Sequence, residues 1–515
     1  MRVVVGLVLA VLPLFSQVAS STLFGSVRDP QGMVIPGAAV TATQESTGRQ
    51  RQVSTSEGGD FVLAGLEPGM YTVRVSNQGF KQTERTGISL ATGERLSLGV
   101  ITLELGALTE TVTVTAASVA VQTRTAERAD ILTPQQIENL QVLGRNHTDL
   151  VQLLPGVVMA NPADQISTTQ QFSVQGSRVT ANNIAIDGLT TTDMGNGFQM
   201  KMDVSQDAVA EVRIVVSNYQ AEYGRMSGSS IQVITKSGTR EFHGLASYFK
   251  RHEQFNANSF FNNRNGQPRS RYRFNTWSYN INGPISIPGL FNRNREKLFF
   301  SWGQEYWPSS RSNSATRTVP TEAERAGDYS ATLDVSGRLI AIRDPDSKAN
   351  FPGNRIPAAR LDPSGTALLK IFPAPNFFDR NISKGNYNYV VEIPADAPRY
   401  THSLKIDANI NSNNTVSAGL HNYKEWTKGT TGASNWPLVR TEMLGNMGGL
   451  SGRYTHIFSP TLINELNAGL VTQPLDMTYS ETEIQRAVRE KVGFTAGQFN
   501  PANNKLNLIP NASFG

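Results

Sequence analysis

Carboxylates and amides occur in this sequence at spacings that imitate a metal site, but none of them completes one. The run Asp407-x-Asn409-x-Asn411-x-Asn413 resembles the start of a calcium-binding loop. Such a loop needs Gly at its sixth position, where this chain has Ser412, and it lacks the Glu required at the twelfth. Asp344 and Asp346 flank a proline without a third ligand at metal spacing. A strand that runs into a polar turn explains the first pattern better than a cation site does.

Other catalytic chemistry is equally poorly supported. The chain has no cysteine, which excludes disulfides, thiolate metal sites and cysteine nucleophiles. No HExxH, GxSxG, Walker or GxGxxG pattern occurs, and the six histidines are scattered. The net charge of +5 is small, and no Lys/Arg cluster interleaves with aromatic residues. We therefore predict no catalytic residue, no metal, no cofactor and no nucleic-acid partner.

One short segment could bind a partner through its backbone alone. Residues 109–116 read Thr-Glu-Thr-Val-Thr-Val-Thr-Ala, an alternating Thr/Val pattern that favours an extended strand. The segment precedes an irregular polar stretch, so it could be an ordinary strand or a free or edge strand. An edge strand can add to the sheet of another protein.

The N-terminus has the pattern of a signal peptide over residues 1–20. Arg2 gives a positive start, an apolar run extends to Phe15, and Val18, Ala19 and Ser20 provide small residues for cleavage. The run is shorter than the roughly 20 apolar residues of a spanning helix, and no other run in the chain is longer. Charged residues make up 17% of the chain, and Gly, Asn, Ser and Thr are frequent, as in exported β-rich proteins. We therefore expect export, with any membrane residence provided by strands.

Residues 21–105 alternate short strand-like runs with turn signals, which predicts a small β-sandwich. Pro68-Gly69 is a typical turn pair, and residues 71–75 (YTVRV) alternate cleanly. The patterns GSVRDPQGMVIPGAAV and STSEGGDFVLAGLEPGMYTVRVSNQGF resemble the carboxypeptidase regulatory-like (transthyretin-like) domain. The resemblance implies an accessory sandwich of open role and does not imply peptidase activity.

Residues 124–238 form a predicted α/β unit. Thr133-Pro134 indicates a helix start, a second helix is expected from His147 to Leu154, and four strands follow. The ordered motifs LGRNHTDLVQLLPGV, IAIDGL, AVAEVRIVV, AEYGR and IQVITKSG resemble the plug domain of TonB-dependent outer-membrane receptors, in particular the Oar-like branch. The motif residues that this resemblance singles out are Asp187, Gly188, Tyr223, Gly224, Arg225, Thr235 and Lys236.

The same resemblance gives the segment before the plug a role. Within residues 106–123, a linker in this scheme, the stretch that resembles the TonB box consists of Glu110, Thr111, Val112, Thr113, Val114, Thr115 and Ala116. The family's TonB box binds TonB, the energy-transducing protein of the inner membrane, by strand addition.

Residues 239–515 change to long amphipathic strands. Leu404, Ile406 and Ala408 alternate with Ser403, Lys405 and Asp407, a pattern that would suit either a soluble sheet or a membrane barrel. EFHGLASYFKR, NGPI, KLFFSWGQEYW and RYTHIFSPTLINELNAGL resemble the Oar-like barrel. Ten of the 25 prolines lie in residues 301–400, which favours a long outer loop there over a disordered linker. A plugged barrel of about 22 strands needs several hundred residues, and 275 follow position 240, so we expect an incomplete barrel and a fragment of a longer receptor.

Together these features predict a mainly β protein: a signal peptide, a small β-sandwich, an α/β plug and an incomplete antiparallel transmembrane β-barrel in the cell outer membrane. The resemblance implies a non-enzymatic receptor or transporter, with TonB, outer-membrane lipid and an unidentified extracellular ligand as partners. The alternative is an adhesin or structural surface protein of the same architecture without active transport. A secreted peptidase is disfavoured because the residues for its chemistry are missing.

Overall fold

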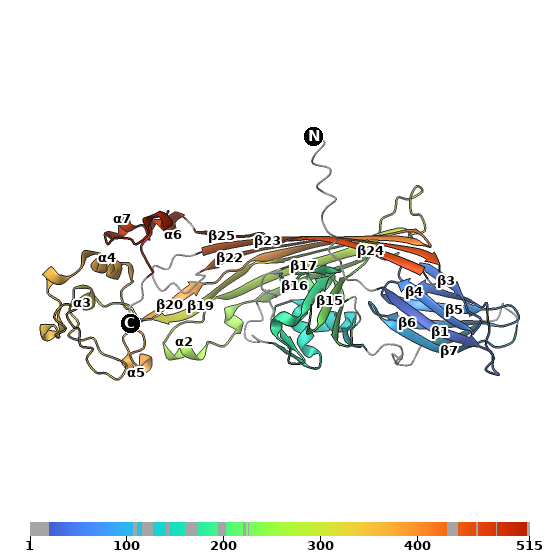
Figure 1. The fold of residues 1–515 in the computed structure, drawn as a ribbon, viewed down its shortest axis with the longest axis horizontal. Helices are drawn as coiled ribbons and strands as arrows, with labels where there is room; N and C mark the ends of the chain where they lie inside the picture. Colours follow the sequence, from blue (N-terminus) through green and yellow to red (C-terminus); the bar gives the residue numbers. More distant parts are fainter. Residues whose placement is uncertain are drawn as a thin grey trace.

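Three β-rich units follow one another along the chain in the computed structural model (Figure 1). A long curved sheet carries the plug against one face, and the sandwich lies at the end of the sheet where β24 begins (Figure 1). Among the described residues, no helix is long and apolar enough to cross a membrane. The structure describes residues 20–106, 111–115, 127–140, 142, 144–159, 172–193, 202–219, 223–224, 226–429, 441–459, 462–479 and 481–511. The predicted signal peptide, apart from Ser20, lies outside these residues.

The N-terminal unit is a sandwich of two sheets around one apolar core. The first sheet has the order β4 (Asp60–Leu66), β1 (Ser21–Arg28) and β7 (Arg95–Thr102), and the second has the order β3 (Gln50–Ser54), β2 (Ala39–Gln44), β5 (Gly69–Ser76), β6 (Gln82–Leu90) and β8 (Thr111–Thr115). In β5, Tyr71, Val73 and Val75 are buried while Thr72 and Arg74 are more exposed, as the sequence pattern predicted. The buried side chains of both sheets meet in one cluster that includes Leu23, Val40, Leu63 and Ile101.

The plug is a five-stranded mixed sheet with short helical segments. The η labels denote 3-10 helices, and the elements are β9 (Arg128–Leu132), α1 (Pro134–Asn139), η2 (His147–Leu153), β10 (Val157–Met159), β11 (Phe172–Val174), η3 (Val179–Ala181), β12 (Asn183–Ile186), β13 (Leu189–Thr190), η4 (Gln206–Ala208), β14 (Val209–Ser217) and β15 (Ser230–Thr235). The sheet order is β13-β12-β15-β14-β9, and β12 and β15 run parallel.

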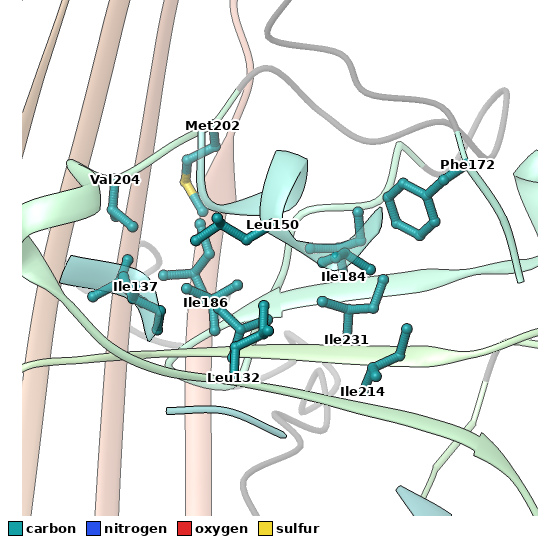
Figure 2. Packing of buried hydrophobic residues seen from close by; sticks show 14 of the residues in the cluster. Leu132, Ile137, Leu150, Phe172, Ile184, Ile186, Met202, Val204, Ile214 and Ile231 are labelled. Carbon is teal, nitrogen blue, oxygen red and sulfur yellow. The ribbon is translucent and has the colours of Figure 1, made fainter. Parts of the chain in front are cut away.

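Local sequence explains where the plug elements begin and what they bury. The predicted start of α1 is confirmed, because Thr133 and Gln136 form a reciprocal capping box in front of Pro134. The second expected helix is present as the 3-10 helix η2. All residues of β12 and β15 are buried. Figure 2 shows apolar side chains of both strands, among them Ile184 and Ile231, in one core with Leu150 and Phe172.

The third unit is a long antiparallel sheet of ten strands. Its strands are β16 (His243–Arg251), β17 (Tyr272–Pro284), β18 (Leu298–Trp307), β19 (Ser309–Arg317), β20 (Tyr389–Pro394), β21 (Arg399–Asn411), β22 (Asn414–Gly429), β23 (Thr441–Ser459), β24 (Leu462–Thr472) and β25 (Leu475–Tyr479). In the part of the chain that the structure describes, β16 pairs with β17 alone and β24 with β23 alone. The barrel-like sheet is therefore open, in agreement with the predicted incomplete antiparallel barrel.

Short helices occupy the connections at the end of the sheet away from the sandwich (Figure 1). They are η5 (Glu253–Phe255), α2 (Phe260–Arg264), α3 (Glu322–Arg325), η6 (Pro352–Asn354), η7 (Ala358–Arg360), α4 (Pro363–Ile371), α5 (Arg380–Ser383), α6 (Glu481–Gln485), α7 (Arg489–Val492) and η8 (Pro501–Asn503). The Pro-rich stretch of residues 301–400 contains strands at both ends and five of these helices between β19 and β20. Its long irregular part therefore runs from 318 to 388.

The long sheet has an inverted distribution of polarity. Along β21, Ser403, Lys405 and Asp407 are buried against the plug, while Leu404 and Ile406 face away from it and are partly exposed. The same alternation continues along β24, where every second residue from Leu462 onward is exposed. A sheet with polar residues toward its interior and apolar residues outside matches the wall of an outer-membrane barrel.

Candidate functional site

Asp187 stands at the centre of a buried polar cluster between the plug and the sheet. Asp187 and Gly188 both have positive φ (45° and 83°), as a two-residue hairpin turn between β12 and β13 requires. The Thr235 backbone N–H donates to one carboxylate oxygen at 3.0 Å, and the Thr235 hydroxyl donates to the other. The structure thus brings together Asp187 and Thr235, two residues of the motifs found in the sequence.

Two side chains of the sheet also contact the carboxylate of Asp187. Lys405 Nζ of β21 lies 3.5 Å from one carboxylate oxygen, and His421 Nε2 of β22 lies 3.3 Å from the other. Burial alone would raise the pKa of Asp187, but the charge of Lys405 and the hydrogen bond of His421 outweigh it and hold that pKa below its usual range. Asp187 is therefore an anion that fixes the plug turn to two strands of the sheet.

The cluster continues to the sandwich. Asp407 neighbours Lys405 on β21 and accepts from Ser417 Oγ at 2.6 Å. Arg453 of β23 lies 3.2 Å from Glu67, in the turn that precedes β5 of the sandwich. These charged groups border one cavity of about 540 Å³, together with Asp187 and Lys405. Side chains of all three units therefore meet at a single cavity.

A second ionic cluster fixes another part of the plug. Arg145, from the LGRN motif, lies 3.0 Å from Glu305 of β18 and 2.9 Å from Asp207 of η4. Its guanidinium also stacks over Phe249 of β16, at 4.1 Å from the ring centre. Arg399 of β21 donates to the Gly144 carbonyl at 2.6 Å. Breaking a buried, paired charge of this kind costs several kcal/mol.

Apolar packing supplements these charges. Leu189, which follows the Asp187-Gly188 turn, projects toward two glycines of the sheet. A Cβ placed at Gly469 would lie 2.2 Å from Leu189 Cδ2, and one at Gly449 would lie 2.9 Å from Cδ1. The plug side chain therefore occupies space that only glycine leaves open in β23 and β24.

Three further motif residues, Tyr223, Gly224 and Lys236, lie elsewhere in the described part of the plug. Lys236 Nζ pairs with Glu138 Oε1 of α1 at 2.8 Å, and the Tyr223 hydroxyl accepts from Arg213 at 3.1 Å. Gly224 follows Tyr223 outside any regular element, and Arg225 lies outside the described residues. Tyr223, Gly224 and Lys236 do not bind Asp187.

The segment that resembles a TonB box is described over five residues. Thr111–Thr115 form β8, which pairs in parallel with β6 of the sandwich. Glu110 and Ala116 lie outside the described residues. The position of β8 at the edge of a sheet is one of the two alternatives that the sequence left open.

Sequence reasoning missed most of the partners at the two ionic clusters. Lys405 and Asp407 lie on a predicted strand, and charged residues on its polar face are the signal that could have marked them. Arg145 lies inside the LGRNHTDLVQLLPGV motif, but no role was predicted for it. His421, Arg453 and Glu67 carry no local signal, because their partners are remote in sequence.

The fold and the clusters define the class of protein: an outer-membrane barrel wall whose interior is occupied by a plug. Comparison with known families supports this class. The sequence matches the outer membrane beta barrel domain over residues 234–515, the carboxypeptidase regulatory-like domain over 22–104 and the TonB-dependent receptor plug domain over 121–231. The chain belongs to the family of the outer membrane beta barrel domain, whose model matches more than half of it, and it carries the plug domain of TonB-dependent receptors.

Individual relatives are more distant. The TonB-dependent transporter Oar of Myxococcus xanthus is 29% identical over 235 residues, which cover 44% of this chain and 21% of that protein. The outer membrane transporter YddB of Escherichia coli is 13% identical with a TM-score of 0.41, over 66% of this chain and 38% of that one. A mutant ferric enterobactin receptor of Pseudomonas aeruginosa is 12% identical with a TM-score of 0.35, over 68% and 46%. This chain thus spans about a fifth of its curated relative and less than half of these two solved chains.

Proposed function

We propose that this receptor takes up or moves a ligand across the outer membrane with energy that TonB delivers through residues 110–116. The observation that carries the proposal is the double ionic attachment of the plug, at Asp187 and at Arg145, to the wall that surrounds it. Spontaneous release of both buried clusters is rare, since each costs several kcal/mol. Opening therefore requires work from outside the receptor.

TonB would perform that work by pulling on the TonB-box segment. The segment precedes the first plug strand, β9, by a short linker, through which tension on the released segment would reach the plug. Strand addition depends mainly on backbone hydrogen bonds, which makes it tolerant of side-chain changes but sensitive to proline.

Proline at Val112 tests this assignment. Val112→Pro removes a backbone donor and should abolish crosslinking to TonB, while the amount of receptor in the outer membrane stays unchanged. Site-specific crosslinking in cells, followed by immunoblotting for TonB, measures the first quantity, and membrane fractionation measures the second.

Ser118→Pro is the matched control, because it introduces the same residue just beyond the segment. It should retain crosslinking close to that of the wild type. Crosslinking that persists at wild-type strength in Val112→Pro would remove residues 110–116 as the TonB contact.

A further inference from the structure

The TonB-box segment is not free in this structure but is docked on the sandwich. Five of its seven residues, Thr111–Thr115, pair in parallel with residues 82–86 of β6, in the register Gln82 to Thr111 through Thr86 to Thr115. β8 is thereby the last strand of the sheet β3-β2-β5-β6-β8. A nearby bridge between Phe80 and Leu105 brings the connecting chain back to the start of β6.

We propose that β6 is a docking site for the chain's own TonB-box segment, so that TonB must compete with β6 for the same strand. The inference rests on the proposed function of residues 110–116 and adds a regulatory role for the sandwich. While β8 is docked, the backbone groups on one of its edges are satisfied by β6. TonB reaches a fully free strand only after β8 leaves.

The contacts of the sandwich with the sheet determine where a force on the docked β8 would be transmitted. The sandwich is attached to the sheet by the Glu67–Arg453 pair, and its Ser46 carbonyl accepts from the Arg240 backbone N–H at 2.9 Å. Force on a docked β8 would enter the five-stranded sheet and pass through these contacts into the wall. Once β8 has left β6, the linker to β9 carries the load to the plug.

The docking is built to be reversible. Parallel pairs are slightly less stable per residue than antiparallel ones, and this pair spans only five residues. Of the two side chains of β8 whose burial is described, Thr113 is exposed and Val112 is half-buried. By comparison, β22 and β23 pair over sixteen register positions.

The strand that holds β8 also leads directly to the plug. β6 ends at Leu90, and two residues later the Thr92 backbone N–H donates to Glu211 Oε1 of β14 at 3.0 Å. β14 pairs in turn with β15, whose last residue, Thr235, binds Asp187. The Asp187 cluster is therefore connected to the β6 docking site by the pairing of β15 with β14 and the hydrogen bond from Thr92 to Glu211.

A reversible crosslink tests the proposal. Glu84 and Thr113 are register partners on β6 and β8, and the chain has no cysteine, so Glu84→Cys with Thr113→Cys gives a single designed disulfide. The full chain is purified in detergent, and binding of the purified periplasmic domain of TonB is measured before and after reduction. The oxidised form should bind at least about tenfold more weakly than the reduced form, because the competent state is no longer populated.

The control pair is Thr41→Cys with Gln52→Cys, register partners on β2 and β3 in the same sheet. It crosslinks the sandwich without holding β8, so its oxidation should leave TonB binding unchanged. Hydrogen exchange of the unmodified chain is the second measurement. The amides of residues 111–115 should be protected before TonB is added, and exchange at the rate of an unstructured peptide would overturn the docking itself.

A synthetic peptide of residues 107–118 separates the two proposals. If the peptide binds the TonB domain but oxidation of the 84–113 pair does not weaken binding, TonB adds to the other edge of β8 and competition with β6 is wrong, while the proposed function stands. If neither the peptide nor the full chain binds, the assignment of residues 110–116 fails. Peptide binding that is tighter than binding to the full chain is the expected result.

Discussion

At the residue scale, the plug is attached to the sheet by one carboxylate, which is contacted by residues of both units. Asp187 could be singled out from the sequence, because an Asp-Gly pair after a buried strand marks a tight turn and the motif resembles a known plug. Its partners Lys405 and His421 could not, because they lie more than 200 residues later and nothing local relates them to the turn. The sequence thus predicted the turn at Asp187. That Lys405 pairs with this carboxylate became visible only in the folded structure.

Asp187→Asn should loosen the plug, since it leaves Lys405 as a buried charge without its anion. We expect a loss of about 3 kcal/mol in plug stability, measured as a lower urea concentration for proteolytic cleavage of the plug in the assembled receptor. Lys405→Met combined with Asp187→Asn should recover part of this loss, because it removes the unpaired charge as well. Strict additivity of the two single changes would show that the pair is not coupled.

The pH dependence of the attachment at Asp187 follows from the direction in which the pKa of Asp187 is shifted. The pKa of Asp187 is lowered in the folded protein, so its contribution is fully present above the ordinary aspartate pKa of about 4. It is lost only as the pH falls below that value toward the lowered pKa. Plug cleavage by a protease that is active in acid should therefore accelerate below pH 4 in the wild type and respond less in Asp187→Asn.

At the element scale, the contact between sandwich and plug joins two carboxylates that resist ionisation. Glu211 of β14 is buried and Glu94 follows β6, and burial raises the pKa of each. The Glu94 charge raises the Glu211 pKa further, whereas the Thr92 hydrogen bond and Arg213 partly oppose the shift. A carboxyl with a raised pKa binds more protons when docked, so docking weakens as the pH rises through that pKa.

Glu211→Gln should strengthen this contact at neutral pH, because it removes the buried charge and keeps an oxygen to accept from Thr92. The measurement is hydrogen exchange of the Thr92 amide, corrected for the intrinsic effect of pH. In the wild type, protection of the Thr92 amide should fall with rising pH. In Glu211→Gln it should not change with pH, and at pH 7 it should exceed that of the wild type. Equal profiles for both proteins would mean that Glu211 does not titrate at the contact.

The strands themselves were largely predictable, but their partners were not. Alternation identified Tyr71–Val73–Val75 as a strand with a buried face, and the capping pattern placed the start of α1 at Pro134. The Thr/Val pattern of residues 111–115 also predicted a strand. It carried no information on docking to β6, since parallel pairing depends on a chain crossing rather than on side-chain alternation.

At the scale of the whole molecule, the plug decides which face of the sheet is inside. Alternation along β21 fits a soluble sheet and a membrane barrel equally well, because period two does not say whether lipid or protein covers the apolar face. In the structure the buried face is the polar one, where Ser403, Lys405 and Asp407 meet the plug. The outward face must therefore be the one that lipid covers.

Leucines on that outward face form a row across three strands. Leu420 is the register partner of Leu450, which in turn is the partner of Leu470, and all three are substantially exposed (44%, 53% and 56%). Leu450→Lys should therefore cost about 2–4 kcal/mol of membrane insertion, as for a charge near the bilayer midplane, whereas Phe458→Lys, next to the end of β23, should cost about 0–1 kcal/mol. Urea titration of the receptor refolded into lipid vesicles measures both. Equal costs at the two positions would contradict the assignment of this face to lipid, because only a bilayer makes the penalty depend on depth along one strand.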